Sequence, residues 1–490
     1  MSSSVEVVGI ERDALLAAIP PVLAAGLLLR GVRPPVAALI ALAGGVALLA
    51  AFPTPPGALA DAGLVALGTA VEVCAIILGG LWLDELLRRS GARDRLSEWL
   101  AGVTADPGRR VLLVVLGVVP FVEAVTGFGV GAIVGLPLLR RLGFDARRAA
   151  VLSLVGFVAV PWGALGPGTL VAARLTGIGF DELGVASAQR TLPVFWVCGL
   201  AALVIGTGAK AAVHRLGTLT VLACTLWLAI LGANLVIGTA MAGIVGAVAS
   251  IGALLVLARR AEGRLPRAGA GVRRAAGPYA LLLVLLLAGQ GAAALAARAG
   301  ADAGAVVLGS AATWLLLTCL VLSWRRGRAA QSPEPRPGPG PFRAVLPRWA
   351  PFGVTTAAFL TLGALMTASG MAAGLAAAGA ALGRAYQGVA PWLGGLGGFL
   401  TGSNAGGNAL FAAAQAEAAK RIGVPVLELV AFQNLAASLG TMGSAARVQL
   451  ALSLLEPEER EGAIARQVLT ACVAAMAALS LLAFVTSGNG

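Results

Sequence analysis

The sequence predicts an all-α polytopic membrane protein, with about twelve transmembrane helices and two re-entrant hairpins arranged as two inverted-topology repeats. Of the 490 residues, 58% are hydrophobic and only 12% are charged, about half the charged fraction of a soluble domain. The mean hydropathy is +0.89. The apolar residues fall into runs of roughly 20, the length that crosses a bilayer as a helix. Gly and Pro recur inside these runs, which membrane helices tolerate.

Twelve runs are long enough to be full spans. We expect these spans near 13–30, 34–52, 58–87, 147–171, 191–210, 216–235, 237–258, 277–297, 303–324, 350–370, 424–454 and 465–486. The stretches 109–140 and 391–419 are apolar but rich in Gly, Pro and small polar residues. We predict that each contains two half-helices separated by a non-helical break. Residues 92–104 are amphipathic and are expected to lie along the membrane interface.

Basic residues gather in short loops between the spans and predict the orientation of the chain. With the N-terminus outside, most Arg and Lys fall in inner loops, as the positive-inside rule expects. The outer loops at 53–57, 298–302 and 371–383 carry almost none, although the pair Lys420-Arg421 falls on the outer side. Because the basic residues form no stripe along one face, the net charge of +13 does not indicate nucleic-acid binding.

The loop charges also suggest two related halves. A shift of 280 residues places the basic loop 88–95 on the uncharged 368–375, and the uncharged 53–57 on a basic loop near 325–348. Such a reversal is expected for inverted-topology repeats. We predict an N-terminal repeat over 1–210 with a break near 120–131, connecting helices and a basic loop over 211–276, and a C-terminal repeat over 277–490 with a Pro/Gly linker at 331–341 and a break near 394–408.

The first break combines a carboxylate with bare backbone. Glu123 precedes Gly127, Gly129 and Gly131, which leave room for a ligand to approach the main chain closely. A carboxylate at membrane depth is costly unless it is paired, solvated or protonated. Glu123 is therefore a candidate proton or cation site beside a substrate pocket, or else an interfacial residue at a helix mouth. Glu72, inside the third span, is a second candidate proton site, or a carboxyl group that bonds to a neighbouring helix.

The second break is polar but uncharged. Ser403 and Asn404 open a half-helix whose free N–H groups and positive dipole end suit an anion, unless these small residues serve only helix packing and capping. Gln433 and Asn434 follow in the next span at helical spacing, where they could line the same cavity or bond to a neighbouring helix. Arg447 could clamp a carboxylate, but its place near the inner end of its span favours an extension to the membrane interface.

Two segments resemble the signatures of the lactate permease family. They are FVEAVTGFGVGAIVGLPLLRRLGF at 121–144 and GFLTGSNAGGNALFAAAQ at 398–415. The resemblance implies proton-coupled import of lactate or a related 2-hydroxy acid such as glycolate. The residues that it marks for the site are Glu123, Thr126, Gly127, Phe128, Gly129, Thr401, Gly402, Ser403, Asn404 and Asn408.

We therefore expect a multi-pass carrier in the cell membrane that binds a small organic anion and a proton and needs no metal or cofactor. The main alternative is a Na⁺-coupled carrier of another small organic anion. A channel is disfavoured because the chain has two diverged halves rather than repeated identical subunits. An enzyme is disfavoured because the sequence has no HExxH, no Ser/His/Asp set and a single His.

Overall fold

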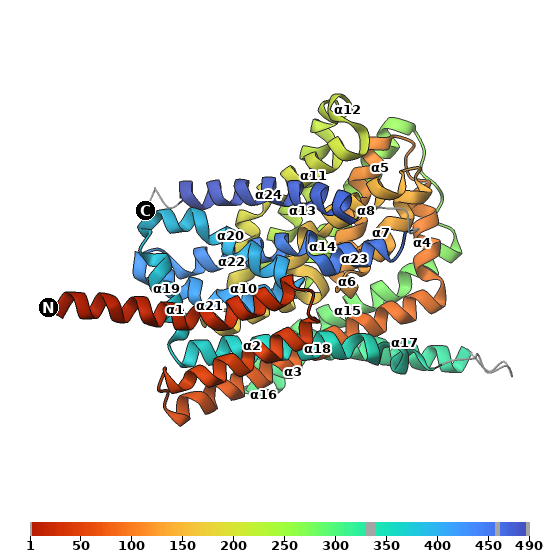
Figure 1. Ribbon diagram of the computed structural model, residues 1–490. Coiled ribbons are helices and arrows are strands. Elements are labelled where there is room, and N and C mark those ends of the chain that lie inside the picture. Colours follow the sequence, from red (N-terminus) through yellow and green to blue (C-terminus); the bar gives the residue numbers. More distant parts are fainter. Residues whose placement is uncertain (1, 330–338, 456–460, 487–490) are drawn as a thin grey trace.

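The computed structural model describes residues 2–329, 339–455 and 461–486, which form helices without strands (Figure 1). Seven of these helices are long and apolar enough to cross a membrane. They are α1 (Ser2–Leu29), α3 (Pro56–Ser90), α13 (Leu216–Val236), α14 (Thr239–Glu262), α15 (Ala270–Arg298), α18 (Pro341–Ala368) and α24 (Glu461–Thr486). Large apolar side chains on their outer faces, such as Leu64 and Leu235, are exposed as a lipid-facing surface requires. The chain is thus a multi-pass membrane protein.

Three pairs of shorter helices give up to three further spans, each bent by 51–58°. The pairs are α8 (Ala146–Val155) with η3 (Phe157–Leu165), α10 (Phe180–Arg190) with α11 (Leu192–Thr207), and α16 (Asp302–Gly309) with α17 (Ala311–Ala329). The total is seven to ten spans in the described residues, so twelve stays a prediction. The predicted spans at 34–52 and 424–454 contain shorter helices, α2 (Pro34–Ala47) with η1 (Leu48–Ala50), and α22 (Val426–Met442) followed by α23 (Ala445–Leu452).

Each of the two Gly-rich stretches contains the predicted non-helical break. The first consists of α5 (Pro107–Leu113), the π-helical turn η2 (Val114–Val118), α6 (Val119–Thr126) and α7 (Val130–Arg141). Gly127 and Gly129 end the first arm because both adopt the left-handed conformations, φ +67° and +94°, that glycine accepts without strain. The second consists of α20 (Tyr386–Thr401) and α21 (Asn404–Ile422), separated at Gly402, whose φ is +65°.

The remaining short helices include some that the sequence did not predict. The amphipathic stretch 92–104 is the helix α4 (Ala92–Ala101), but the expected outer loop 371–383 contains α19 (Met371–Ala380) and η4 (Gly383–Ala385). The others are α9 (Pro167–Thr176) and α12 (Ala209–Val213). Most of the predicted linker at 331–341 lies outside the described residues.

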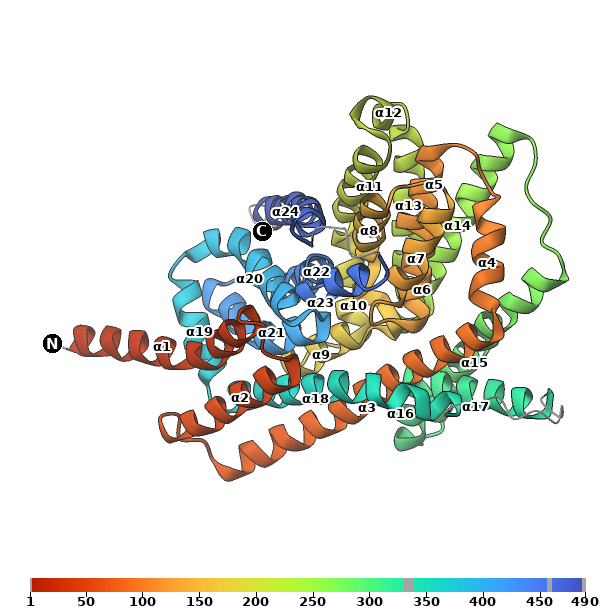
Figure 2. The same cartoon turned by 45° about the vertical axis from the view of Figure 1, so that its right-hand side comes forward.

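Two large hydrophobic cores meet at the first break. One joins α5–α8 to α11, α13, α14 and α24, and the other joins α1–α3 to α15, α17, α18 and α21. Phe121 of α6 packs against both cores. Both views place α3 and α18 side by side along one edge of the molecule, while the first turns of α1 project beyond the other helices (Figures 1 and 2). The helix α6, which leads into the break, thus packs against both cores.

Candidate functional site

The two breaks, far apart in the sequence, line one cavity of about 400 Å³. Helices α2, α3, α9, α18 and α23 complete its wall. Its polar and charged lining residues are Glu123, Arg348, Thr355, Thr356, Thr401, Ser403, Asn404 and Arg447. At the rim Pro34, Pro351 and Phe352 are exposed, whereas Glu123 and Asn404 are buried. The cavity is therefore a funnel that leads from the surface to both breaks.

Glu123 lies at the floor of this cavity and is only 4% exposed. Both of its carboxylate oxygens accept hydrogen bonds from the N–H of Gly129 at 3.2 Å, and Oε2 accepts another from Gly131 at 3.2 Å. The carboxylate thus caps the start of α7, where the helix dipole favours negative charge. Of the two interpretations of Glu123, its burial and its place in the cavity favour a site residue over an interfacial one.

Arg447 of α23 faces Glu123 across the cavity. Its Nη2 lies 3.6 Å from Oε1 of Glu123, and its guanidinium carbon lies 4.9 Å from the ring centroid of Phe157. The expectation that Arg447 reaches outward to the membrane interface is wrong, since the residue is only 9% exposed. The reason is a further break at Gly443, which ends α22, after which Ser444 caps a new helix with its side chain. The sequence predicted a single span over 424–454, which placed Arg447 near the inner end of that span.

The backbone around the cavity is strained. Among the described residues, the non-glycine residues with positive φ are Phe128 (53°), Ala164 (34°) and Leu165 (71°). Phe128 and Ala164 line the cavity and Leu165 follows them in the chain. Such conformations persist only where surrounding packing enforces them, and they cluster at functional sites. A Cβ on Gly127 would collide with the Cβ of Ala164, so this glycine allows the first break to lie against η3.

The second break presents uncharged donors to the cavity. Ser403 caps α21 by accepting a hydrogen bond from the N–H of Gly406 at 3.4 Å. The N–H groups of Asn404 and Ala405 have no acceptor among the described residues, and both residues line the cavity. Thr401, at the end of α20, instead donates its hydroxyl to the carbonyls of Gly397 and Ser403 at 2.8 and 2.9 Å. The start of α21 therefore offers two backbone donors to a ligand.

A buried network of amides and hydroxyls lies behind Asn404. Asn434 Oδ1 accepts hydrogen bonds from the side chains of Asn404 and Asn408 at 3.1 and 2.9 Å. Asn434 in turn donates to the hydroxyls of Thr169 and Ser187 at 3.0 and 3.1 Å. Asn408, Gln433 and Asn434 are completely buried and do not line the cavity. Of the two alternatives for Gln433 and Asn434, the structure favours bonding to neighbouring helices.

Three other predicted site residues also lie outside the cavity lining. Thr126 is buried and donates its hydroxyl to its own helix, at the carbonyl of Val122. Gly129 underlies Arg447, because a Cβ there would collide with Nη1 of that arginine. Glu72 accepts a hydrogen bond from Ser310 at 2.9 Å, in the bend between α16 and α17. This contact agrees with the interpretation of Glu72 as a carboxyl group bonded to a neighbouring helix.

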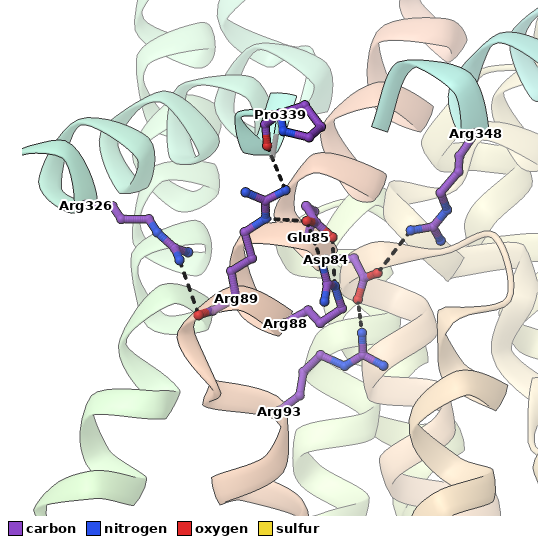
Figure 3. A network of polar contacts seen from close by, with 8 residues as sticks. All are labelled: Asp84, Glu85, Arg88, Arg89, Arg93, Arg326, Pro339 and Arg348. Carbon is purple, nitrogen blue, oxygen red and sulfur yellow. Dashed lines mark hydrogen bonds and ion pairs between the residues drawn. The ribbon is translucent and has the colours of Figure 1, made fainter. Parts of the chain in front are cut away.

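A second cluster of charges borders the cavity at Arg348 of α18 (Figure 3). Asp84 of α3 is 1% exposed and lies 2.7 Å from Arg93 Nη1 and 3.9 Å from Arg348 Nη1. Its neighbour Glu85 accepts a bidentate pair of hydrogen bonds from Arg88 at 2.8 and 2.7 Å and a further one from Arg89. These contacts join the end of α3 to α4 and α18, and they leave Arg348 as a partly exposed cation at the rim.

The chain is similar to known proteins over most of its length. The sequence profile described as L-lactate permease matches residues 13–267 and 342–487. A glycolate permease of Escherichia coli is 34% identical over 132 residues, which are 26% of this chain and 23% of that protein. An L-lactate permease of Escherichia coli is 30% identical over 132 residues, 26% of this chain and 24% of that protein. The aligned segments thus span less than a quarter of these relatives.

Proposed function

Because the chain belongs to the L-lactate permease family, we propose that it imports small monocarboxylates, such as lactate, glycolate or a similar 2-hydroxy acid, by proton symport. The observation that carries the proposal is the single cavity lined by both breaks. It brings a buried carboxylate, Glu123, together with uncharged donors at Ser403 and Asn404. The cavity volume, about 400 Å³, suits a small organic anion.

Proton coupling follows from the charge of the substrate. A 2-hydroxy acid is an anion at neutral pH, and its import alone opposes the interior-negative potential by about 2.3 kcal/mol per 100 mV. One accompanying proton makes the movement electroneutral. Glu123 is the proposed proton carrier because it lies in the cavity, whereas Glu72 does not. Asn434 and Asn408 hydrogen-bond to the side chain of Asn404, which lines the cavity, and Gln433 donates to Asn408 behind them.

The positions of the helices support the proposal of two repeats, whose inversion rests on the loop charges. A shift of 280 residues carries α3 onto 336–370 and α4 onto 372–381, near α18 (Pro341–Ala368) and α19 (Met371–Ala380). It carries α10 and α11, which span 180–207, onto 460–487, near α24 (Glu461–Thr486).

In the predicted orientation, Pro34 and Arg348 at the rim of the cavity adjoin inner loops. We therefore propose that the cavity opens toward the cytoplasm in this conformation.

Uptake into proteoliposomes tests the coupling ion. The full-length protein is reconstituted and given radiolabelled L-lactate with an inward proton gradient, an inward Na⁺ gradient or neither. The proposal expects accumulation with the proton gradient alone, and loss of accumulation when a protonophore is added. Accumulation driven only by Na⁺ would support the Na⁺-coupled alternative. Equilibration without accumulation under every gradient would support a channel.

A further inference from the structure

The guanidinium group of Arg447 is the least satisfied charged group in the cavity. Arg447 is 9% exposed, yet none of its side-chain nitrogens has a hydrogen-bond acceptor within the described part of the chain. Its contacts are the ion pair with Glu123 at 3.6 Å, too long for a hydrogen bond, and the face of Phe157. A buried guanidinium normally uses its five donors, and its planar fork matches a carboxylate. The unused donors point into a cavity that they share with the proposed substrate.

Glu123 is held independently of Arg447. Its three hydrogen bonds from Gly129 and Gly131 come from the backbone of α7 and would survive if Arg447 turned to another partner. Of the charged residues that line the cavity, Glu123 and Arg447 are buried, whereas Arg348 lies at the exposed rim and shares Asp84 with Arg93. Without substrate, Glu123 and Arg447 therefore balance each other. An added anion would leave one uncompensated negative charge at a buried position, which is costly.

We infer that the substrate carboxylate binds Arg447 in bidentate fashion, replaces Glu123 as its counter-ion, and makes Glu123 take up a proton. This inference rests on the proposed function and states which groups are charged before and after the substrate binds. Before binding, Glu123 is a carboxylate paired with Arg447. After binding, the substrate carboxylate is paired with Arg447, and Glu123 is a neutral carboxylic acid whose proton comes from water on the open side. No charge is gained or lost in the cavity, so anion and proton enter together.

The same assignment gives the second break a different role. With the carboxylate on Arg447, the free N–H groups of Asn404 and Ala405 are left for the 2-hydroxyl group. Arg447 is close to this break, because a Cβ on Gly402 would lie 3.2 Å from the Cβ of Ala446, the residue before Arg447. The inference thus refines the expectation that the second break binds the carboxylate itself.

Proton uptake on binding tests this exchange. L-Lactate is added to the purified full-length protein in weakly buffered detergent solution that contains a pH indicator, and binding is measured in parallel. The wild type should take up about one proton for each lactate bound. Glu123→Gln should bind lactate at least as tightly, since the competing carboxylate is gone, but should take up none. Proton uptake by Glu123→Gln equal to that of the wild type would overturn the exchange.

Arg447→Gln is tested in the Glu123→Gln background, because removing both charges leaves no buried carboxylate unpaired. Relative to Glu123→Gln alone, lactate affinity should fall roughly 30-fold or more, the lower range for loss of one partner of a buried charge pair. Unchanged affinity would overturn the role of Arg447. The double variant Arg190→Gln with Glu428→Gln is a matched control. It removes another Arg–Glu pair, 2.8 Å apart, whose arginine lies over the ring of Phe432 and which does not line the cavity.

The Arg190→Gln, Glu428→Gln control should retain wild-type affinity and proton uptake.

Failure of the inference can be distinguished from failure of the proposed function. If the wild type accumulates lactate with protons but the Arg447 variant binds it unchanged, the transport function stands and the assignment of Arg447 falls. If the wild type neither binds nor accumulates lactate, both fall.

Discussion

Gly129 allows Glu123 and Arg447 to approach each other. Its N–H donates to both oxygens of Glu123, and its φ of +94° is one that only glycine adopts easily. A Cβ at this position would collide with Nη1 of Arg447 and with Leu450. Gly129 thus holds Glu123 through its N–H and leaves room for Arg447, although it does not itself line the cavity.

Gly129→Ala should therefore abolish lactate uptake. Gly143 is a suitable control because it has the same φ of +94°, but a Cβ added there would meet no atom within 4 Å. Each alanine should cost about 1–2 kcal/mol of stability from the left-handed backbone. Uptake assays and thermal unfolding in detergent separate this strain from the collision. Equal loss of uptake in both variants would show that strain alone is responsible.

At the scale of single residues, the sequence singled out Glu123 and the second break, both of which line the cavity, but it did not place Arg447 there. Glu123 stands out because a carboxylate beside Gly-Phe-Gly in an apolar run is rare and costly. Arg447 follows Gly443 and Ser444, a glycine with a capping serine, and this signal predicts a break that would have turned the arginine inward. The break was not predicted, because the apolar residues on either side of it resemble one continuous span.

At the scale of helices, glycine located both predicted breaks, whereas several short helices escaped prediction. α10 and α19 are 11 and 10 residues long and are too short for a span. α19 is rich in Ala and Gly, and what fixes it is packing against α1 and α21, which is a tertiary effect. Hydropathy locates long apolar helices well, but it does not reveal which short segments another helix will cover.

The charge cluster at the end of α3 makes a separate prediction about stability (Figure 3). Asp84→Asn removes the charged partner of Arg93 at a position that is 1% exposed. Breaking a buried ion pair in this way should destabilise the protein by about 3 kcal/mol. Thermal unfolding in detergent measures the loss.

Glu417→Gln is the matched control for Asp84→Asn. It breaks the pair of Glu417 with Lys420, whose side chain is 60% exposed, and should cost less than about 1 kcal/mol. Equal melting temperatures for Asp84→Asn and this control would contradict a structural role for the buried cluster.

At the scale of the whole molecule, inverted repeats require equivalent positions to face opposite sides of the membrane. Glu98 of α4 and Ala378 of α19 are both exposed and are separated by 280 residues. Single cysteines at these positions, in a background without the five native cysteines, should differ in labelling by a membrane-impermeant thiol reagent in intact cells. The predicted orientation expects labelling at 378 and none at 98. Labelling of both from the same side would contradict the inversion.

The proposed mechanism depends most on the claim that Glu123 couples substrate movement to protons. The direct test compares Glu123→Gln with the wild type in proteoliposomes, first for lactate accumulation under an inward proton gradient and then for exchange of internal for external lactate without a gradient. The mechanism predicts that the variant exchanges lactate but accumulates none, because its cavity still binds the anion and cannot release a proton. Accumulation by Glu123→Gln at the wild-type level would contradict the claim, and Glu72 would become the next residue to test.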